Sequence, residues 1–104
     1  MAQMTVIYQA TADQSAFDAH YFNVHIPLAK KLPGLLSYKI TKAPIISTTG
    51  HNDVYLIGHL FFENMEALKQ AFSSEIDQQC AADRRILAPN PDDVQIYIYE
   101  TIET

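Results

Sequence analysis

The four histidines are the side chains of this sequence best suited to chemistry, because histidine gains or loses a proton near neutral pH. Two of them, His20 and His25, lie in residues 13–32, where apolar residues recur with helical spacing. On a regular helix they flank the apolar stripe and diverge by about 140°, so they cannot ligate one metal ion together. Pro27 deletes the hydrogen bond to the Asn23 carbonyl, which predicts a kink and a free acceptor beside His25. A buried structural histidine and a proton-transferring histidine both fit this pattern.

His59 stands in the middle of the most hydrophobic segment, residues 54–62, where a polar side chain needs a hydrogen-bond partner or a cavity. A structural hydrogen bond to a tyrosine and a role in a pocket are both open interpretations. His51 falls in a loop rich in turn residues and is expected to be exposed. Tyr8 and Tyr38 lie in predicted strands, where a phenol hydroxyl can polarise a carbonyl oxygen, although tyrosines are first of all core residues.

The sequence lacks the motifs of several common enzyme classes. Its three glycines cannot form a dinucleotide-binding or phosphate-binding loop, and it has neither Gly-x-Ser-x-Gly nor Cys-x-x-Cys. The single cysteine, Cys80, lies on a helical apolar stripe, is expected to be inert, and cannot form an intrachain disulfide. We therefore expect no metal ion and no cofactor, and we expect the cytoplasm as the compartment.

The charge distribution argues against two kinds of partner. Residues 75–104 carry the whole net charge of −5, because they hold seven acidic residues and two arginines. An acidic chain without a basic face does not favour nucleic acid, and we expect this acidic excess to lie away from any pocket. No apolar run approaches the roughly 18 residues of a membrane span, and the first residues do not have the pattern of a signal peptide.

The elements that must position these side chains follow the order strand, helix, strand, strand, helix, strand. We predict strands over residues 4–10, 35–43, 54–62 and 94–100, a helix over 13–32, a helix after Asn64, and a further helical stretch after a Ser74–Asp77 capping box. This order is that of the ferredoxin-like βαββαβ fold, an α+β fold with an antiparallel sheet and its helices on one face. The length predicts a single domain, residues 1–104.

Strand periodicity predicts what covers the other face of the sheet. Along residues 54–62 one side carries aliphatic residues, and the other side carries Tyr55, Ile57, His59 and Phe61. A large aromatic face of this kind does not stay in contact with water in a monomer, so we expect a homodimer formed through it. A chain this short also has little room for an enclosed cavity, so a second copy is expected to complete the pocket for a small-molecule ligand.

Two segments of the chain resemble the EthD-like family. The segment FDAHYFNVHIPLAKKLPGL, residues 17–35, resembles the signature of that family, and HLFFENMEALKQAF, residues 59–72, resembles its strand and second helix. The matching positions of the first segment are Phe17, Tyr21, His25, Pro27, Leu28, Ala29, Leu32, Pro33 and Gly34. The resemblance implies a dimeric α+β barrel in which two ferredoxin-like sheets pack face to face.

The resemblance also implies a range of activities. The family is named after a protein linked to degradation of ethyl tert-butyl ether and carries an oxidoreductase label. Related dimeric barrels include cofactor-free monooxygenases, muconolactone-type isomerases and polyketide-type cyclases, in which a helix histidine and a strand tyrosine act together. His25 and Tyr38 match these two residues by position. Where His59 stands, relatives often have an acidic residue, a change that alters charge and proton preference at that position.

Three hypotheses of function follow from the residues and the resemblance. In the first, the protein is a metal-free enzyme acting on a compact carbonyl, lactone or phenolic compound, with His25 as general acid or base and Tyr38 holding the oxygen. The residues expected to shape the substrate pocket are Tyr8, Tyr55, His59 and Phe61. In the second, the same barrel binds or delivers a hydrophobic metabolite without catalysis. In the third, aromatic side chains fill the barrel, and the protein is an interaction module.

Overall fold

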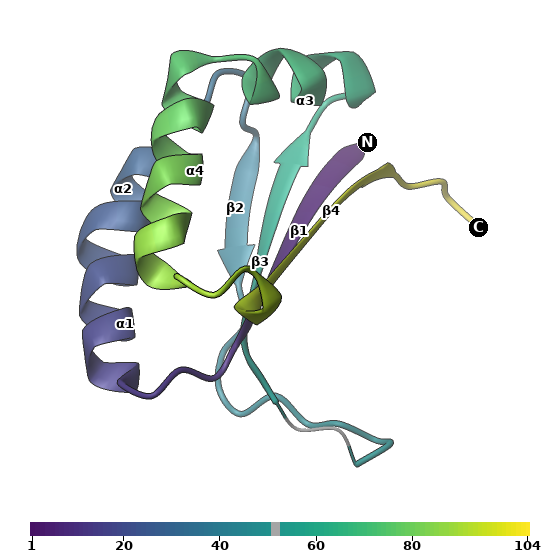
Figure 1. Ribbon diagram of the computed structural model, residues 1–104. Coiled ribbons are helices and arrows are strands. Elements are labelled where there is room, and N and C mark those ends of the chain that lie inside the picture. Colours follow the sequence, from purple (N-terminus) through teal and green to yellow (C-terminus); the bar gives the residue numbers. More distant parts are fainter. Residues whose placement is uncertain (51–52) are drawn as a thin grey trace.

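The computed structural model describes residues 1–50 and 53–104, so the prediction for His51 lies outside the described residues (Figure 1). The strands are β1 (Ala2–Gln9), β2 (Ser37–Ile40), β3 (Val54–Phe62) and β4 (Val94–Glu100). The helices are α1 (Gln14–His20), α2 (Ile26–Ala29), α3 (Met65–Phe72) and α4 (Glu75–Leu87). A π-helical turn (Tyr21–His25) joins α1 to α2, and a short 3₁₀ turn (Pro91–Asp93) precedes β4.

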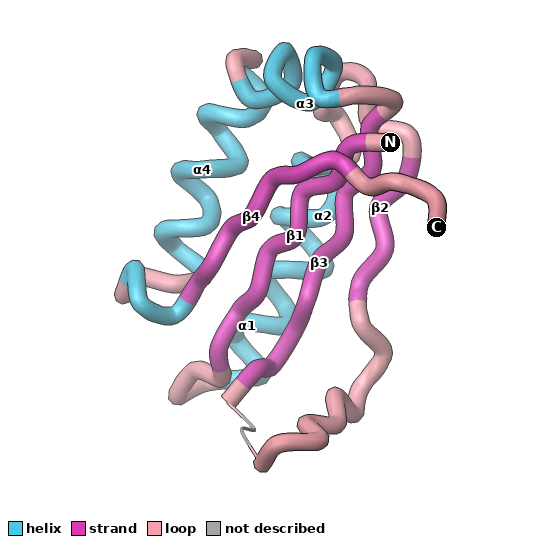
Figure 2. Tube along the Cα trace, turned by 90° about the vertical axis from the view of Figure 1, so that its right-hand side faces the viewer, coloured by secondary structure: helices cyan, strands magenta, loops and turns pink. Residues whose placement is uncertain are grey.

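The four strands form one antiparallel sheet in the order β2-β3-β1-β4. Figure 2 shows this sheet with the helices behind it, so one face is covered by helices and the other is open. The element order, the strand order and the one-sided helices together confirm the predicted ferredoxin-like α+β fold. In the part of the chain that the structure describes, no helix is long and apolar enough to cross a membrane.

The sheet separates a core layer from the open face, because successive side chains of a strand point to opposite sides. In β1 buried and half-buried residues alternate along the whole strand, and the buried ones face the helices. In β3 the corresponding buried positions are Leu56, Gly58, Leu60 and Phe62. The hydrophobic core therefore lies between the sheet and the helices, while Ile7 and Ile57 pair on the open face.

Side-chain caps stand at the start of α1, α3 and α4, and two of them, Asn64 and Ser74, lie at predicted positions. Asp13 accepts a hydrogen bond from the Ala16 N–H at 3.0 Å, and Asn64 accepts one from Ala67 at 2.8 Å. The hydroxyl of Ser74 accepts a bond from the N–H of Asp77 at the start of α4. Each cap satisfies one of the backbone donors that the first turn of a helix leaves without a partner.

The predicted first helix is present, and its middle forms a π turn. The N–H of Ile26 donates to the carbonyl of Tyr21, five residues earlier, which defines the π turn. Pro27 has no N–H to donate into this region, so the usual four-residue pattern cannot continue through it. The consequence is an extra residue in the turn that carries Tyr21 and His25 into the core.

Candidate functional site

A carboxylate joins the two histidines of the first helical region. Nδ1 of His25 lies 2.8 Å from one oxygen of Asp83, and Nε2 of His20 lies 2.6 Å from the other. Asp83 comes from α4, which packs against the π turn, and it is buried together with His25. The site is thus a buried histidine on one helix, held by a buried carboxylate on another.

The π turn explains why both histidines reach the same carboxylate. A regular helix predicts that residues five apart diverge by about 140°, and this expectation is wrong for His20 and His25. In a turn closed by bonds between residues five apart, those residues lie above one another, as residues four apart do in an α-helix. Pro27 is the residue in the sequence that indicates this π turn. The turn changes the directions of the His20 and His25 side chains as well as the path of the helix.

The charges at this site follow from burial and hydrogen bonding. Burial raises the pKa of Asp83, but the hydrogen bonds from His20 and His25 outweigh it and leave that pKa below its usual value. Burial lowers the pKa of His25 below 6.5, although the hydrogen bond to Asp83 acts in the opposite direction. Near neutral pH Asp83 is therefore an acceptor only, and His25 is neutral with its proton on Nδ1. Its Nε2 is left with a free lone pair, which is the requirement for a general base.

A group of three buried tyrosines lies beside His25 on the helix side of the sheet. The ring of Tyr21 stacks on His25 at 5.4 Å, and the Tyr21 hydroxyl lies 2.5 Å from that of Tyr38. Tyr8 packs its ring edge against Tyr21 at 5.7 Å. Burial raises the pKa of all three hydroxyls, so they are protonated donors at neutral pH. The structure thus connects His25 to Tyr38 through Tyr21, a residue that the sequence interpretation does not place in the site.

Gly58 makes room for the tyrosine pair. A Cβ at this position would lie 3.3 Å from the Tyr21 hydroxyl and 3.7 Å from the Tyr38 ring. A glycine in the middle of a buried strand often marks a close approach of this kind. The Tyr21–Tyr38 hydroxyl pair therefore sits directly over the sheet backbone.

His59 and Phe61 lie on the opposite face of the sheet from this site. Their burial alternates with that of Leu60, which faces the helices, so within one chain they do not share a side of the sheet with His25, and their place in a substrate pocket stays a prediction. Nδ1 of His59 is hydrogen-bonded at 3.3 Å to Gln3 rather than to a tyrosine, and the His59 ring stacks on Phe61. Nζ of Lys39 lies 5.6 Å above the Phe61 ring.

Tyr55 departs from the strand alternation that groups it with His59. The register between β1 and β3 shifts after Tyr8, so one extra residue of β3 is left without a partner at this point. The Tyr55 hydroxyl donates to the carboxylate of Asp18 on α1, on the helix side of the sheet. With Asp18 and Phe22 it lines a separate hollow of about 420 Å³, whose lining does not include His25 or Tyr38.

Asp83 is the residue of the site that the sequence interpretation misses. It belongs to the acidic excess of residues 75–104, which is expected to lie away from any pocket, and for Asp83 this expectation is wrong. The sequence does hold a signal, because Asp83 follows Cys80 by three residues and precedes Leu87 by four, which places it on the same helical side. Cys80 and Leu87 are buried, and burial raises the pKa of Cys80 to about 11, as expected for an inert thiol.

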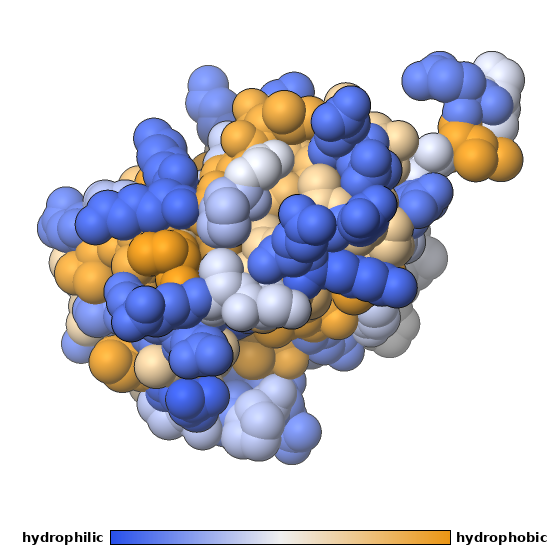
Figure 3. Space-filling view, turned by 90° about the horizontal axis from the view of Figure 1, so that it is seen from above, coloured by the Kyte–Doolittle hydropathy of each residue, from blue (hydrophilic) through white to orange (hydrophobic). Residues whose placement is uncertain are grey.

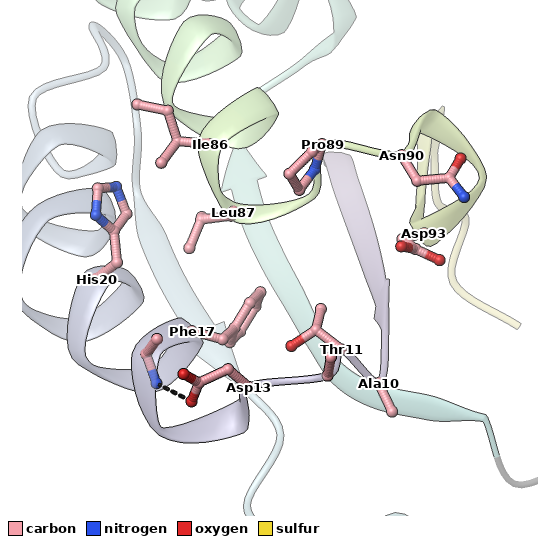
Figure 4. A pocket seen from close by; sticks show the side chains of 12 residues that line it. Ala10, Thr11, Asp13, Phe17, His20, Ile86, Leu87, Pro89, Asn90 and Asp93 are labelled. Atoms are coloured by element: carbon pink, nitrogen blue, oxygen red, sulfur yellow. Dashed lines mark hydrogen bonds between the residues drawn. The ribbon is translucent and has the colours of Figure 1, made fainter.

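A hollow of about 610 Å³ opens between the start of α1 and the end of α4 (Figure 4). His20 lies at one edge of it, and the ring of Phe17 points into it. Because His20 also binds Asp83, this hollow is one side chain away from the carboxylate that holds His25. Within residues 1–50 and 53–104, no three His, Cys, Asp or Glu side chains gather closely enough to hold a metal ion.

The fold and the site define a ferredoxin-like α+β protein with a buried histidine–carboxylate pair. Residues 9–88 match the model of the EthD domain, so the chain belongs to the EthD family and the resemblance is confirmed. It is 32% identical over 83 residues to an uncharacterised 11.0 kDa protein of the thcB-thcC intergenic region of Rhodococcus erythropolis, with 80% of each chain covered.

Solved structures show the same fold, and one of them belongs to the same family. An ethyl tert-butyl ether degradation (EthD) family protein from Bacillus halodurans is similar with a TM-score of 0.87 and 30% identity over 98% of this chain and 99% of that one. SnoaB, a cofactor-independent oxygenase from Streptomyces nogalater, shares the fold with a TM-score of 0.65 and 11% identity over 99% and 94% of the two chains. A dimeric ferredoxin-like protein of unknown function from Jannaschia shares it with a TM-score of 0.66 and 15% identity over 97% and 100%.

Proposed function

We propose that this EthD-family protein is a small-molecule enzyme in which His25 removes a proton from its substrate. The observation that carries the proposal is the buried hydrogen bond from His25 Nδ1 to Asp83. This bond fixes the neutral tautomer whose Nε2 is basic, and the carboxylate stabilises the imidazolium that forms when the proton arrives. Burial keeps His25 in its neutral form, so the base is ready at neutral pH.

The neighbouring hydroxyls support a carbonyl, lactone or phenolic compound as the substrate. Removal of a proton next to a carbonyl group places negative charge on its oxygen, which needs hydrogen-bond donors. The hydroxyl pair of Tyr21 and Tyr38 is protonated and lies one stacked ring away from His25. Isomerisation, cyclisation and cofactor-free oxygenation by dioxygen all begin with such a proton transfer. The oxygenase SnoaB, which shares the fold, is consistent with the last of these.

We further infer that two copies of the chain pair through the open face of the sheet. Aromatic and aliphatic side chains on this face have no helix over them, and β4 is exposed along most of its length. Figure 3 shows the C-terminal residues standing apart from the body, and Ile102 among them is 85% exposed. The dimeric Jannaschia protein has the same fold, which supports this pairing.

We also propose the cytoplasm as the compartment of the protein. The single cysteine, which is free and buried, supports this proposal.

Deuterium exchange tests the proton transfer whatever product the complete reaction forms. Compact β-keto acids, lactones and phenols are incubated with the protein in D₂O, and NMR follows the loss of carbon-bound protons next to the carbonyl group or beside the phenol hydroxyl, because O–H protons exchange without a catalyst. We expect catalysed exchange with at least one class, at a rate that rises with pH and levels off, because only neutral His25 is basic. Since burial lowers the pKa of His25, the midpoint of the rise should fall below pH 6.5.

Two other outcomes of the same experiment are informative. A midpoint above pH 6.5 would contradict the assignment of His25 as the base. A compound that raises the melting temperature without any exchange would favour the accessory protein that binds a metabolite over the enzyme.

A further inference from the structure

Arg84 is a mostly buried cation beside the proposed site. The proposed proton transfer does not use it. It follows Asp83 in α4 and lies on the buried side of that helix, with 8% of its surface exposed. The next residue, Arg85, is exposed. The two adjacent arginines thus have the same charge in the same helix but opposite environments.

The side chain of Arg84 makes no ion pair and no hydrogen bond within the described parts of the chain, residues 1–50 and 53–104. The carboxylate next to it, Asp83, is already bonded to both histidines. Asp77, two turns earlier on the same helix, does not come within ion-pair distance. The nitrogens of its guanidinium are not among the fully buried side-chain atoms that lack a partner, so they keep contact with solvent. A mostly buried cation that is open to solvent and has no ion-pair partner is available to bind an anion.

The charge of Arg84 is felt by the three tyrosines and by His25, as well as by Cys80 and Asp77 on its own helix. Burial raises the pKa of the Tyr8, Tyr21 and Tyr38 hydroxyls, and in each case the Arg84 charge acts in the opposite direction. The same charge adds to burial in lowering the pKa of His25. Arg84 therefore lies within electrostatic reach of the groups proposed to handle the substrate.

We infer that Arg84 binds an anionic oxygen of the substrate, supplied by a carboxylate or a phenolate. The inference rests on the proposed function for the position of the substrate and narrows its class to compact organic anions. A planar guanidinium suits this task, because it offers paired N–H donors to two oxygens and keeps its charge at any physiological pH.

Binding of matched anionic and neutral probes tests the inference directly. Benzoate is compared with benzamide, and 4-nitrophenolate with 4-nitroanisole, by the shift in melting temperature and by calorimetry. We expect at least one anion to bind ten-fold or more tightly than its neutral partner, and the pair that shows this identifies the source of the anionic oxygen. Equal affinities within both pairs, or no shift with either anion, would overturn the inference.

Arg84→Met, Arg84→Lys and the matched control Arg85→Met identify the residue. Arg84→Met should lose the preference for the anion, Arg84→Lys should weaken it, and Arg85→Met should retain it. Without ligand, Arg84→Met should melt at or above the temperature of the native protein, because it removes a charge that has no ion-pair partner and keeps an apolar stem. A lower melting temperature for Arg84→Met, or anion binding that survives it, would show that Arg84 has a structural role instead.

The failure of this inference is distinguishable from the failure of the proposed function. Anion binding through Arg84 without any catalysed exchange would refute the enzyme alone. Catalysed exchange without a preference for anions would refute the role of Arg84 alone.

Discussion

Replacement of His25 by glutamine is expected to lower the rate of catalysed proton exchange by about 10²–10⁴-fold, the range that general bases contribute. Glutamine can still donate a hydrogen bond to Asp83, so the packing between the π turn and α4 should persist. It has no basic nitrogen, however, so it cannot accept the proton that Nε2 is proposed to take. The exchange assay and a far-ultraviolet spectrum of the same sample separate loss of chemistry from loss of fold.

His59→Gln is the matched control for this substitution. His59 carries the same side chain on the opposite face of the sheet, where it is bonded to Gln3. We expect His59→Gln to retain the native exchange rate within a factor of about three. Equal rates for His25→Gln and the native protein would remove His25 from the mechanism.

Asp83→Asn should lower the exchange rate by a similar order, about 10³–10⁴-fold, as the corresponding change does in the Ser-His-Asp triad. The amide of asparagine can donate a hydrogen bond to Nδ1 of His25, which favours the tautomer with the ring proton on Nε2 and blocks the base. The double variant should be little worse than either single variant, because the two residues act as one unit. Additive losses would contradict the pairing of His25 with Asp83.

Replacement of Ile57 by arginine is expected to convert a dimer into a monomer at micromolar concentration. Ile57 lies near the centre of the open face, paired with Ile7 of β1. In a two-fold interface the substitution introduces two like charges where apolar side chains meet, at a cost of several kcal/mol. A cost of about 3 kcal/mol is already enough to raise the dissociation constant of the dimer more than about 100-fold. Sedimentation of the native and variant proteins measures this change.

Ile86→Arg provides the control, because Ile86 is 64% exposed on α4, on the helix side of the molecule. It introduces the same charge and volume outside the proposed interface, so we expect it to sediment as the native protein does. A native protein that is a monomer at this concentration, or a dimer that persists in Ile57→Arg, would contradict pairing through the open face.

Local features of the chain are predictable from the sequence because they depend on neighbouring residues. The caps at Asp13, Asn64 and Ser74 follow from residue types that satisfy backbone donors within three positions. The two faces of β3 follow from the period of two in an extended chain, which places His59 and Leu60 on opposite sides. These local rules are sufficient for the order of the elements and for the fold.

The composition of the site depends on contacts between distant residues. His25 and Asp83 are 58 positions apart, and a charged residue in a helix ordinarily indicates a solvated face. The bulge that turns Tyr55 towards Asp18 depends on the register between two strands, which the sequence of one strand does not determine. His25 and His59 are each unusual in their own segment, and only the assembled sheet shows that they lie on opposite sides of it.

Asp83 is proposed to hold His25 as a neutral base with a free Nε2. It can be tested without any substrate by nitrogen-15 NMR of the imidazole side chains at pH 7. The structure predicts that His25 carries its proton on Nδ1, bonded to Asp83, and that Nε2 has the shift of an unprotonated nitrogen. A proton on Nε2, or a doubly protonated ring at this pH, would contradict the account.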